Sequence, residues 1–408
     1  MKKILSILIL APVLLVLCAQ IDDGLSDEAL DLIGRVEAGV ESESYLYLTG
    51  IIAGEDESPV LVGKSLLEEY RKREADESYK VEPYPDSKKL ALPEGEAFCR
   101  ASTDECIGYL FSGKIDAGKL LKDHGVLVSR SNRFFEFDEY RTLTKPTVSE
   151  LYPPYEYIMA AERIKVIGAI SAYKNGDTET AIESLLNQLA KLRKSMELQD
   201  NLIGKFVFLV KLSEVIDVLS VILSNEGLEA EMIPGLSDSE KSFYTVAARE
   251  FGMSYNTFKS LDRHPQFFEM GGDFPGWITR MLYKPNMSIN AVAPRYTRLE
   301  RLARLSPSEF AREVEVEDKA RPSTSKVRNY IGGVLISYAP ELEKYVAEFH
   351  DFDAKLALFN QVHHLKLAPG SMENPYYGNE TPKEADGKLC FRGPLESQRS
   401  LRCLRVKI

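Results

Sequence analysis

The chain has 408 residues, a formal net charge of −11 and a hydrophobic content of 44%. This excess of negative charge is unfavourable for general binding to nucleic acid or to anionic membranes, so we expect no nucleic-acid partner. The length and the apolar content allow a large core, divided between two or three lobes.

The first 19 residues have the layout of a secretory signal peptide. Lys2 and Lys3 precede a largely apolar run over residues 4–17, and the small residues Cys18 and Ala19 follow it. The run is shorter than the roughly 20 residues of a membrane-spanning helix, and we expect no transmembrane span in the mature chain. We predict cleavage after Ala19 and a periplasmic or secreted bacterial protein. The alternative is a lipoprotein anchored through Cys18, which we disfavour because a leucine precedes the cysteine.

The four remaining cysteines are Cys99, Cys106, Cys390 and Cys403. An even number in an exported chain indicates disulfides. Of the three pairings that four cysteines allow, we favour 99 with 106 and 390 with 403, because each pair shares a short segment. Zinc and redox motifs use closer spacing, typically C-x-x-C, so we expect no metal and no cofactor. Each bond should contribute about 2.5 to 3 kcal/mol through its short loop.

Composition and turn signals divide the chain into five parts. These are a signal peptide (1–19), an N-terminal helical region with a disulfide-clipped loop (20–150), a central helical hairpin core (151–260), a C-terminal helical region (261–370), and a tail with a disulfide-clipped β-hairpin (371–408).

The first part of the mature chain should contain helices over 26–40 and around 64–73. The first opens with a capping serine and early acidic residues, which suit a helix N-terminus. Residues 79–98 are rich in proline and lack a helical period, so we expect an extended surface crossing.

Three long helices are predicted over 156–174, 178–196 and 199–224, because apolar residues recur there with helical spacing. Asn175 and Gly176 can stop the first helix, and the next residues can cap the second. So short a connection makes the two helices antiparallel neighbours.

This connection resembles the turn of a tetratricopeptide repeat, in which the second helix often begins as Gly176, Asp177, Ala181 and Ile182 do here. The resemblance covers one hairpin, and no second copy follows at a 34-residue period. We interpret the segment as a helical hairpin and assign no family.

After this core, residues 262–277 combine aromatics, glycines and prolines. We interpret them as a lobe junction tied down by its aromatic residues, with an ordered functional loop as the alternative. Helices should resume over 289–305, 308–316, 341–349 and 352–367. The fold class is therefore mainly α, built of antiparallel helical hairpins or a bundle, with a small C-terminal β-hairpin.

The C-terminal hairpin is predicted from the period-two alternation of residues 388–392 and 400–408. One face is apolar and should pack on the helices, and the other carries both cysteines, which can then form a cross-strand disulfide. That second face also carries four basic residues, which we call the hairpin basic face: Lys388, Arg392, Arg405 and Lys407. It is suited to an acidic partner or to lipid phosphates; the simpler interpretation is a solvated terminus.

Aromatic residues beside prolines form a second set of interest. They can stack on glycans or peptides, although such tyrosines more often anchor loops to a core, which we favour. The residues of this aromatic set are Tyr152, Tyr155, Tyr157, Tyr376, Tyr377 and Trp277.

Motifs for catalysis and nucleotide binding are weak. A GKS at 63–65 lacks the glycine that a phosphate-binding loop needs five residues earlier, where Ser58 stands. The adjacent residues 363 and 364 are both histidines, but neighbours on a helix cannot chelate one metal. His350, Asp351 and Asp353 are expected at a helix junction, with the acids as caps. No H-E-x-x-H, G-x-S-x-G or G-x-G-x-x-G occurs.

The leading hypothesis is a non-catalytic protein-binding or assembly factor of the cell envelope, with another envelope protein as its partner. The first alternative is an envelope hydrolase that acts on glycan or peptide through a carboxylate pair, which sequence alone does not identify. The second alternative is a carrier that holds an apolar ligand between helices.

Overall fold

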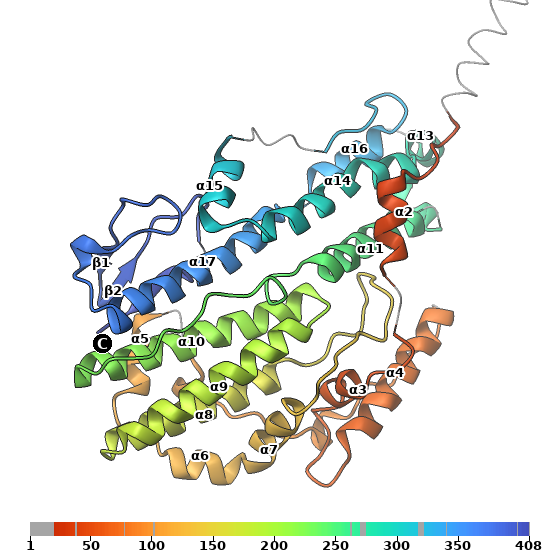
Figure 1. Cartoon of the computed structure of the whole chain (residues 1–408). Coiled ribbons are helices and arrows are strands. Elements are labelled where there is room, and N and C mark those ends of the chain that lie inside the picture. Colours follow the sequence, from red (N-terminus) through yellow and green to blue (C-terminus); the bar gives the residue numbers. More distant parts are fainter. Residues whose placement is uncertain are drawn as a thin grey trace, which may run out of the picture.

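The chain folds into stacked helices with a small sheet near the C-terminus, which confirms the predicted fold class (Figure 1). The computed structural model describes residues 20–36, 39–76, 78–100, 103–261, 263–269, 275–316, 322–339, 341–397 and 399–407. The expected signal segment, Cys18 included, lies outside these ranges. Within them, no helix is long and apolar enough to cross a membrane.

The first described helix, α2 (Asp27–Gly34), is shorter than expected. The Ser26 side chain accepts a hydrogen bond from the Ala29 amide and starts the helix as predicted. The helix ends early because the chain turns, and the Val36 amide donates to the Ile33 carbonyl at 3.0 Å. Figure 1 shows α2 against two helices from the distant second half of the chain, α11 (Tyr244–Leu261) and α14 (Pro285–Ala303).

Helices α3 (Glu43–Thr49) and α4 (Pro59–Ala75) cross through two glycines. A Cβ on Gly63 would overlap the Leu46 carbonyl oxygen, and one on Gly50 would overlap the Pro59 carbonyl oxygen. The GKS stretch therefore lies inside a helix, and its glycine serves helix packing.

The predicted central helices are present as α8 (Glu156–Lys174), α9 (Thr178–Leu198) and α10 (Leu202–Glu226). The Asp177 side chain caps α9 by accepting from the Thr180 amide at 3.2 Å. Helix α10 is buried along most of its length, between α8 and α9 on one side and α17 with the sheet on the other (Figure 1). Three short helices precede this core: α5 (Asp104–Leu110), α6 (Ala117–Asp123) and α7 (Gly125–Phe134).

The second half of the chain adds seven helices to the described structure. Helices α11 and α16 were not predicted, and α12 and α13 lie in the expected loop region. The helices are α11 (Tyr244–Leu261), α12 (Pro265–Glu269), α13 (Gly276–Met281), α14 (Pro285–Ala303), α15 (Pro307–Val316), α16 (Tyr330–Ser337) and α17 (Glu343–Phe359).

The predicted break near residue 350 is wrong. Residues 343–359 form the single helix α17, which continues into a π-helical turn, Asn360–His364. His350 and Asp351 are buried inside the helix, and neither caps it. The Tyr376 hydroxyl donates to Asp351 at 2.7 Å. Because a partner from another segment satisfies this carboxylate, the acidic residue does not have to end the helix.

The C-terminal hairpin is present, with one strand more than predicted. Strands β1 (Lys383–Ala385), β2 (Lys388–Cys390) and β3 (Cys403–Arg405) form an antiparallel sheet in that order. Leu389 pairs with Leu404 and both are buried, so the apolar face packs inward as expected.

Buried apolar residues form one continuous core. This core runs across the positions expected to separate regions, near 150, 260 and 370. The central helix α10 contacts α8, α9, α17 and β3, so residues from the middle and the end of the chain share the same interior.

Candidate functional site

A cavity of about 650 Å³ lies where α8, α10 and α17 meet the sheet and the segment that precedes α5. Both disulfides reach it, through Cys99 and Cys403. Three acidic residues line it: Glu156, Glu214 and Asp217. Six basic residues line it as well: Arg100, Arg163, Lys211, Lys355, Lys388 and Arg399. We call it the cationic cavity.

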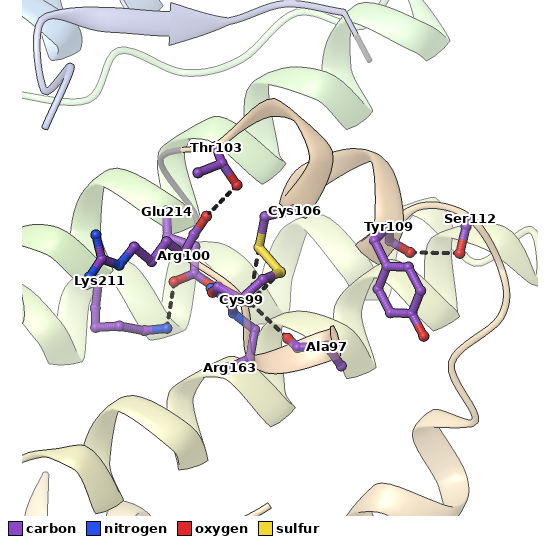
Figure 2. Close-up of a disulfide and its surroundings, with 10 residues drawn as sticks. All are labelled: Ala97, Cys99, Arg100, Thr103, Cys106, Tyr109, Ser112, Arg163, Lys211 and Glu214. Carbon is purple, nitrogen blue, oxygen red and sulfur yellow. Dashed lines mark hydrogen bonds and ion pairs between the residues drawn. A yellow bond between two sulfur atoms is a disulfide. The ribbon is translucent and has the colours of Figure 1, made fainter. Parts of the chain in front are cut away.

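The first disulfide joins Cys99 to Cys106, which confirms the predicted pairing (Figure 2). Arg163 of α8 holds this loop in place. Its guanidinium donates from Nη1 to the Ala97 carbonyl at 2.8 Å and from Nη2 to the Cys99 carbonyl at 3.1 Å, and Nη1 lies 3.5 Å from the Cys106 Sγ. One buried cation therefore fixes the disulfide loop against the wall of the cavity.

The same arginine belongs to a buried group of three charges (Figure 2). The Arg163 Nε pairs with Glu214 Oε1, and the Lys211 Nζ lies 2.5 Å from Glu214 Oε2. Burial alone would raise the pKa of Glu214, but the two cations outweigh burial and the pKa is lowered. The carboxylate is thus ionised, and two cations share it.

A second buried group surrounds Asp217, one turn further along α10. The Lys355 Nζ donates to Asp217 Oδ2 at 2.6 Å and to Ser213 Oγ at 2.7 Å, and the Arg405 amide donates to Asp217 Oδ1 at 3.0 Å. Burial lowers the pKa of Lys355 and Asp217 opposes that change; the nearby positive charges of Lys388 and Arg405 lower it further. Positive charge accumulates at this end of the cavity as well.

The opening of the cavity carries two exposed arginines, Arg100 and Arg399. The Arg399 guanidinium lies 5.2 Å above the Phe206 ring and 3.4 Å from Glu348. Next to it, Ser400 has φ of 55°, a left-handed conformation that is unfavourable for residues other than glycine. The rim is therefore held in a defined shape beside an exposed charge.

The four residues of the hairpin basic face do not share one surface. Lys388 lines the cationic cavity, and Arg405 is buried. Arg392 is exposed and stacks over the Tyr377 ring at 4.4 Å. Lys407 is exposed, 3.8 Å from Glu384. The second predicted disulfide, Cys390–Cys403, is present between β2 and β3.

The aromatic set is also dispersed. Tyr155, Tyr157 and Tyr376 are buried, Tyr152 and Tyr377 are half-buried, and the Trp277 side chain is 65% exposed. None of the six lines the cationic cavity. The Tyr155 hydroxyl donates to the Gln199 side chain at 2.9 Å, so its role here is that of an internal anchor.

Outside the cavity, Glu150 and Glu250 are neighbouring acidic residues with raised pKa values. Burial raises the pKa of Glu250 to about 7, and the neighbouring Glu150 adds to this effect. Burial also raises the pKa of Glu150, although Arg249 opposes the change. Tyr152 hydrogen bonds to Glu150. Among the described residues, no three His, Cys, Asp or Glu side chains gather as metal ligands would.

The sequence contains a signal for the cavity that motif searching does not use. Lys211, Glu214 and Asp217 recur every three residues within the apolar stretch VFLVKLSEVIDVLSVIL, so they lie on neighbouring positions of one helix face. Charges in a helix this apolar have to be paired inside the protein. Lys211 and Glu214 pair with each other, but the further partners Arg163 and Lys355 come from α8 and α17, which local sequence does not reveal.

Comparison of the chain with protein-family models, curated proteins and solved structures finds no match. The site is therefore interpreted from its own chemistry.

Proposed function

We propose that the chain is a non-catalytic binding protein of a bacterial cell envelope, and that it holds a protein partner through the cationic cavity. The observation that carries the proposal is a cavity of about 650 Å³ whose charged walls are fixed by buried ion pairs. Ligand sites commonly have volumes of roughly 300 to 1,000 Å³ and are largely formed before binding. Fixed charges reduce the ordering cost of association.

The state of the buried acids supports binding over catalysis. Both oxygens of Glu214 are engaged by cations, and both oxygens of Asp217 accept hydrogen bonds. A general acid or base needs a pKa near the working pH, whereas the pKa of Glu214 is lowered. Of the described residues that line the cavity, none is a histidine, tyrosine or tryptophan.

The two disulfides support the envelope location. Disulfides persist in oxidising compartments such as the periplasm and are rare in the cytosol. Together with the expected signal segment, they favour an exported chain that meets its partner outside the cytoplasm.

The test blocks the cavity by size without altering its charge. Ala160 of α8 lines the cavity, and Ala160→Trp should fill it. Gly168→Trp places the same side chain on an exposed position of the same helix, where no atom lies within 4 Å of a Cβ. Tagged variants are incubated with an envelope fraction, and the retained proteins are quantified.

We expect the wild type and Gly168→Trp to retain the same protein, and Ala160→Trp to lose it. Equal retention by both tryptophan variants would contradict the proposal. Turnover of a glycan or peptide by the purified wild type would also contradict it.

One observation favours the second candidate, an envelope hydrolase. The Glu250 carboxyl has a pKa of about 7 and lies near Glu150 and Tyr152, so part of it is protonated at neutral pH, as a general acid requires. If this pair is catalytic, Glu250→Gln abolishes hydrolysis of cell-wall material while Glu156→Gln, in the cavity, leaves it unchanged. A carrier of apolar ligands is less well supported, because charged residues make up much of the cavity wall.

A further inference from the structure

The sign of the charge in the cavity is opposite to that of the whole chain. Six of its nine charged lining residues are basic, in a protein with a net charge of −11. In one buried group, two cations, Arg163 and Lys211, share the single carboxylate of Glu214, and in the other Lys355 pairs with Asp217. A cavity lined in this way attracts anions, and the attraction is strongest where water is excluded.

The rim cations come from three separate segments of the chain. Arg100 precedes α5, Lys388 belongs to β2, and Arg399 precedes β3. In Figure 2, the Arg100 side chain extends away from α5 to the side where Lys211 and Glu214 of α10 lie. Cations spread around an opening suit several anionic groups along one ligand better than they suit a single anionic head.

Apolar side chains occupy other parts of the same wall. Leu92, Phe98, Met159, Val210 and Leu401 all line the cavity. The Met159 side chain is 38% exposed, so an apolar group is available to a ligand before binding. A ligand that satisfies the whole wall therefore needs apolar groups between its anionic ones.

We propose that the cationic cavity binds an acidic peptide segment, in which carboxylate side chains alternate with apolar ones, from the protein partner. This inference rests on the proposed function and names the chemistry of the partner. The carboxylates lie at the rim beside Arg100, Lys388 and Arg399, and the apolar side chains pack on the wall of α8 and α10. The net negative charge of the chain disfavours general association with an acidic partner away from this cavity.

Peptide binding tests the inference directly. A short synthetic peptide of alternating Glu and Leu is titrated into the full oxidised chain by calorimetry, in parallel with a peptide in which Gln replaces each Glu. We expect the Glu peptide to bind at least about tenfold more tightly, because only its carboxylates pair with the rim. Raising the salt concentration should weaken the Glu peptide and leave the Gln peptide nearly unchanged.

Charge reversal locates the peptide. Arg399→Glu reverses the charge of an exposed rim residue and should weaken binding of the Glu peptide by at least about tenfold; it also removes the cation beside the buried Glu348, so the folding of this variant has to be verified. Lys388→Ala is the second variant, and circular dichroism verifies that each variant is folded. Lys407→Glu is the matched control, because Lys407 is exposed on the same sheet region and does not line the cavity.

Equal affinity for the Glu and Gln peptides would overturn the inference. So would an equal loss of affinity for the Glu peptide in Arg399→Glu and Lys407→Glu. The third contrary result is that inorganic phosphate, or dodecanoate, binds as tightly as the Glu peptide. The last result would assign the cavity to a small anion. The failures are distinguishable from failure of the proposed function. If Ala160→Trp still abolishes retention of the partner while the peptides do not differ, the binding function stands and the acidic segment is wrong.

Discussion

The α3–α4 contact and the wall of the cationic cavity use opposite means to place two segments close together. At the first, Gly50 and Gly63 remove side chains so that the helix backbones touch. At the second, α8, α10 and α17 approach through buried charges, with Glu214 between Arg163 and Lys211. Close backbone packing stabilises a fold directly, whereas burying ions costs desolvation energy that pairing only partly returns. The charged wall is therefore a less economical way to join helices than the glycine contact, and the proposed binding role would account for that cost.

The largest effect is expected from Glu214→Gln, which breaks the charged wall. The change leaves Arg163 and Lys211 buried with excess positive charge, and such losses cost about 3 to 5 kcal/mol. The free energy of unfolding in urea measures it. As a control, Glu156→Gln alters an exposed acid of the same cavity and should change stability by less than about 0.5 kcal/mol.

A second variant, in which all three charged residues of the wall are replaced, separates the cost of an unpaired charge from the contribution of the whole group. Exchange of Arg163, Lys211 and Glu214 for apolar residues of similar volume should cost less stability than Glu214→Gln, because no buried charge is left unpaired, although the hydrogen bonds from Arg163 to the Ala97 and Cys99 carbonyls are lost. Binding of the acidic peptide should fall. A large loss of stability in this triple variant would show that the wall is structural.

The next effect is expected at low pH, where the free energy of unfolding should fall because of the buried His350 of α17. Burial lowers the pKa of His350 from 6.5 to about 4. The folded state therefore binds this proton less readily than the unfolded state, so the stabilising contribution is present above pH 6.5 and is lost as the pH falls towards 4. The full loss is about 3 kcal/mol.

Unfolding free energies between pH 7 and pH 4 measure this loss. His350→Gln keeps a donor for the Leu302 carbonyl, which His350 contacts at 3.0 Å, and removes the titration. The variant should lose less stability over this range than the wild type. The exposed His364 provides the control, and His364→Gln should follow the wild-type profile.

A smaller effect is expected at the glycine contact. Gly63→Ala forces α3 and α4 apart, because the new Cβ meets a backbone carbonyl that cannot rotate away; overpacking of this kind costs about 1 to 3 kcal/mol. Gly168→Ala, on an open position of α8, should stabilise the protein by about 0.5 to 1 kcal/mol through helix propensity. Thermal unfolding of the two variants measures whether each change lowers or raises stability. If Gly63→Ala and Gly168→Ala both destabilise the protein, the packing argument is refuted.

The smallest effect is expected at Lys407. Its distance of 3.8 Å from Glu384 on an exposed surface makes the ion pair weak, so Lys407→Ala should change the unfolding free energy by less than about 0.5 kcal/mol. A larger change would mean that the exposed edge of the sheet contributes more to stability than its solvation suggests.

Local sequence signals predicted the helices well where caps and apolar period agree. Helix α8 begins and ends where expected, because a tyrosine-proline turn precedes it and Asn175 with Gly176 follows it. The signals failed near His350, where the polar residues inside α17 have the pattern of a junction between two helices. Strands β2 and β3 and both disulfides followed from short-range spacing alone, whereas β1 was missed.

The cavity could not be predicted in the same way, since its walls come from residues far apart in the chain. Lys355 and Asp217 are separated by 138 positions, and Lys388 adds a third segment. Only the charged stripe of α10 was visible in advance. A buried helix with three regularly spaced charges predicts that partners exist, but their identity depends on how the helices stack.

The Cys390–Cys403 bond closes a loop that contains Arg399 and Ser400, and Lys388 lies just outside it. A newly made chain with free thiols still has the sequence to form its helices, but nothing covalent holds that loop against β2. The cations of the opening then sample many arrangements, and affinity for an acidic segment falls accordingly. If the proposed function holds, binding competence would arise only after oxidation, and a chain held in a reducing compartment would not capture its partner.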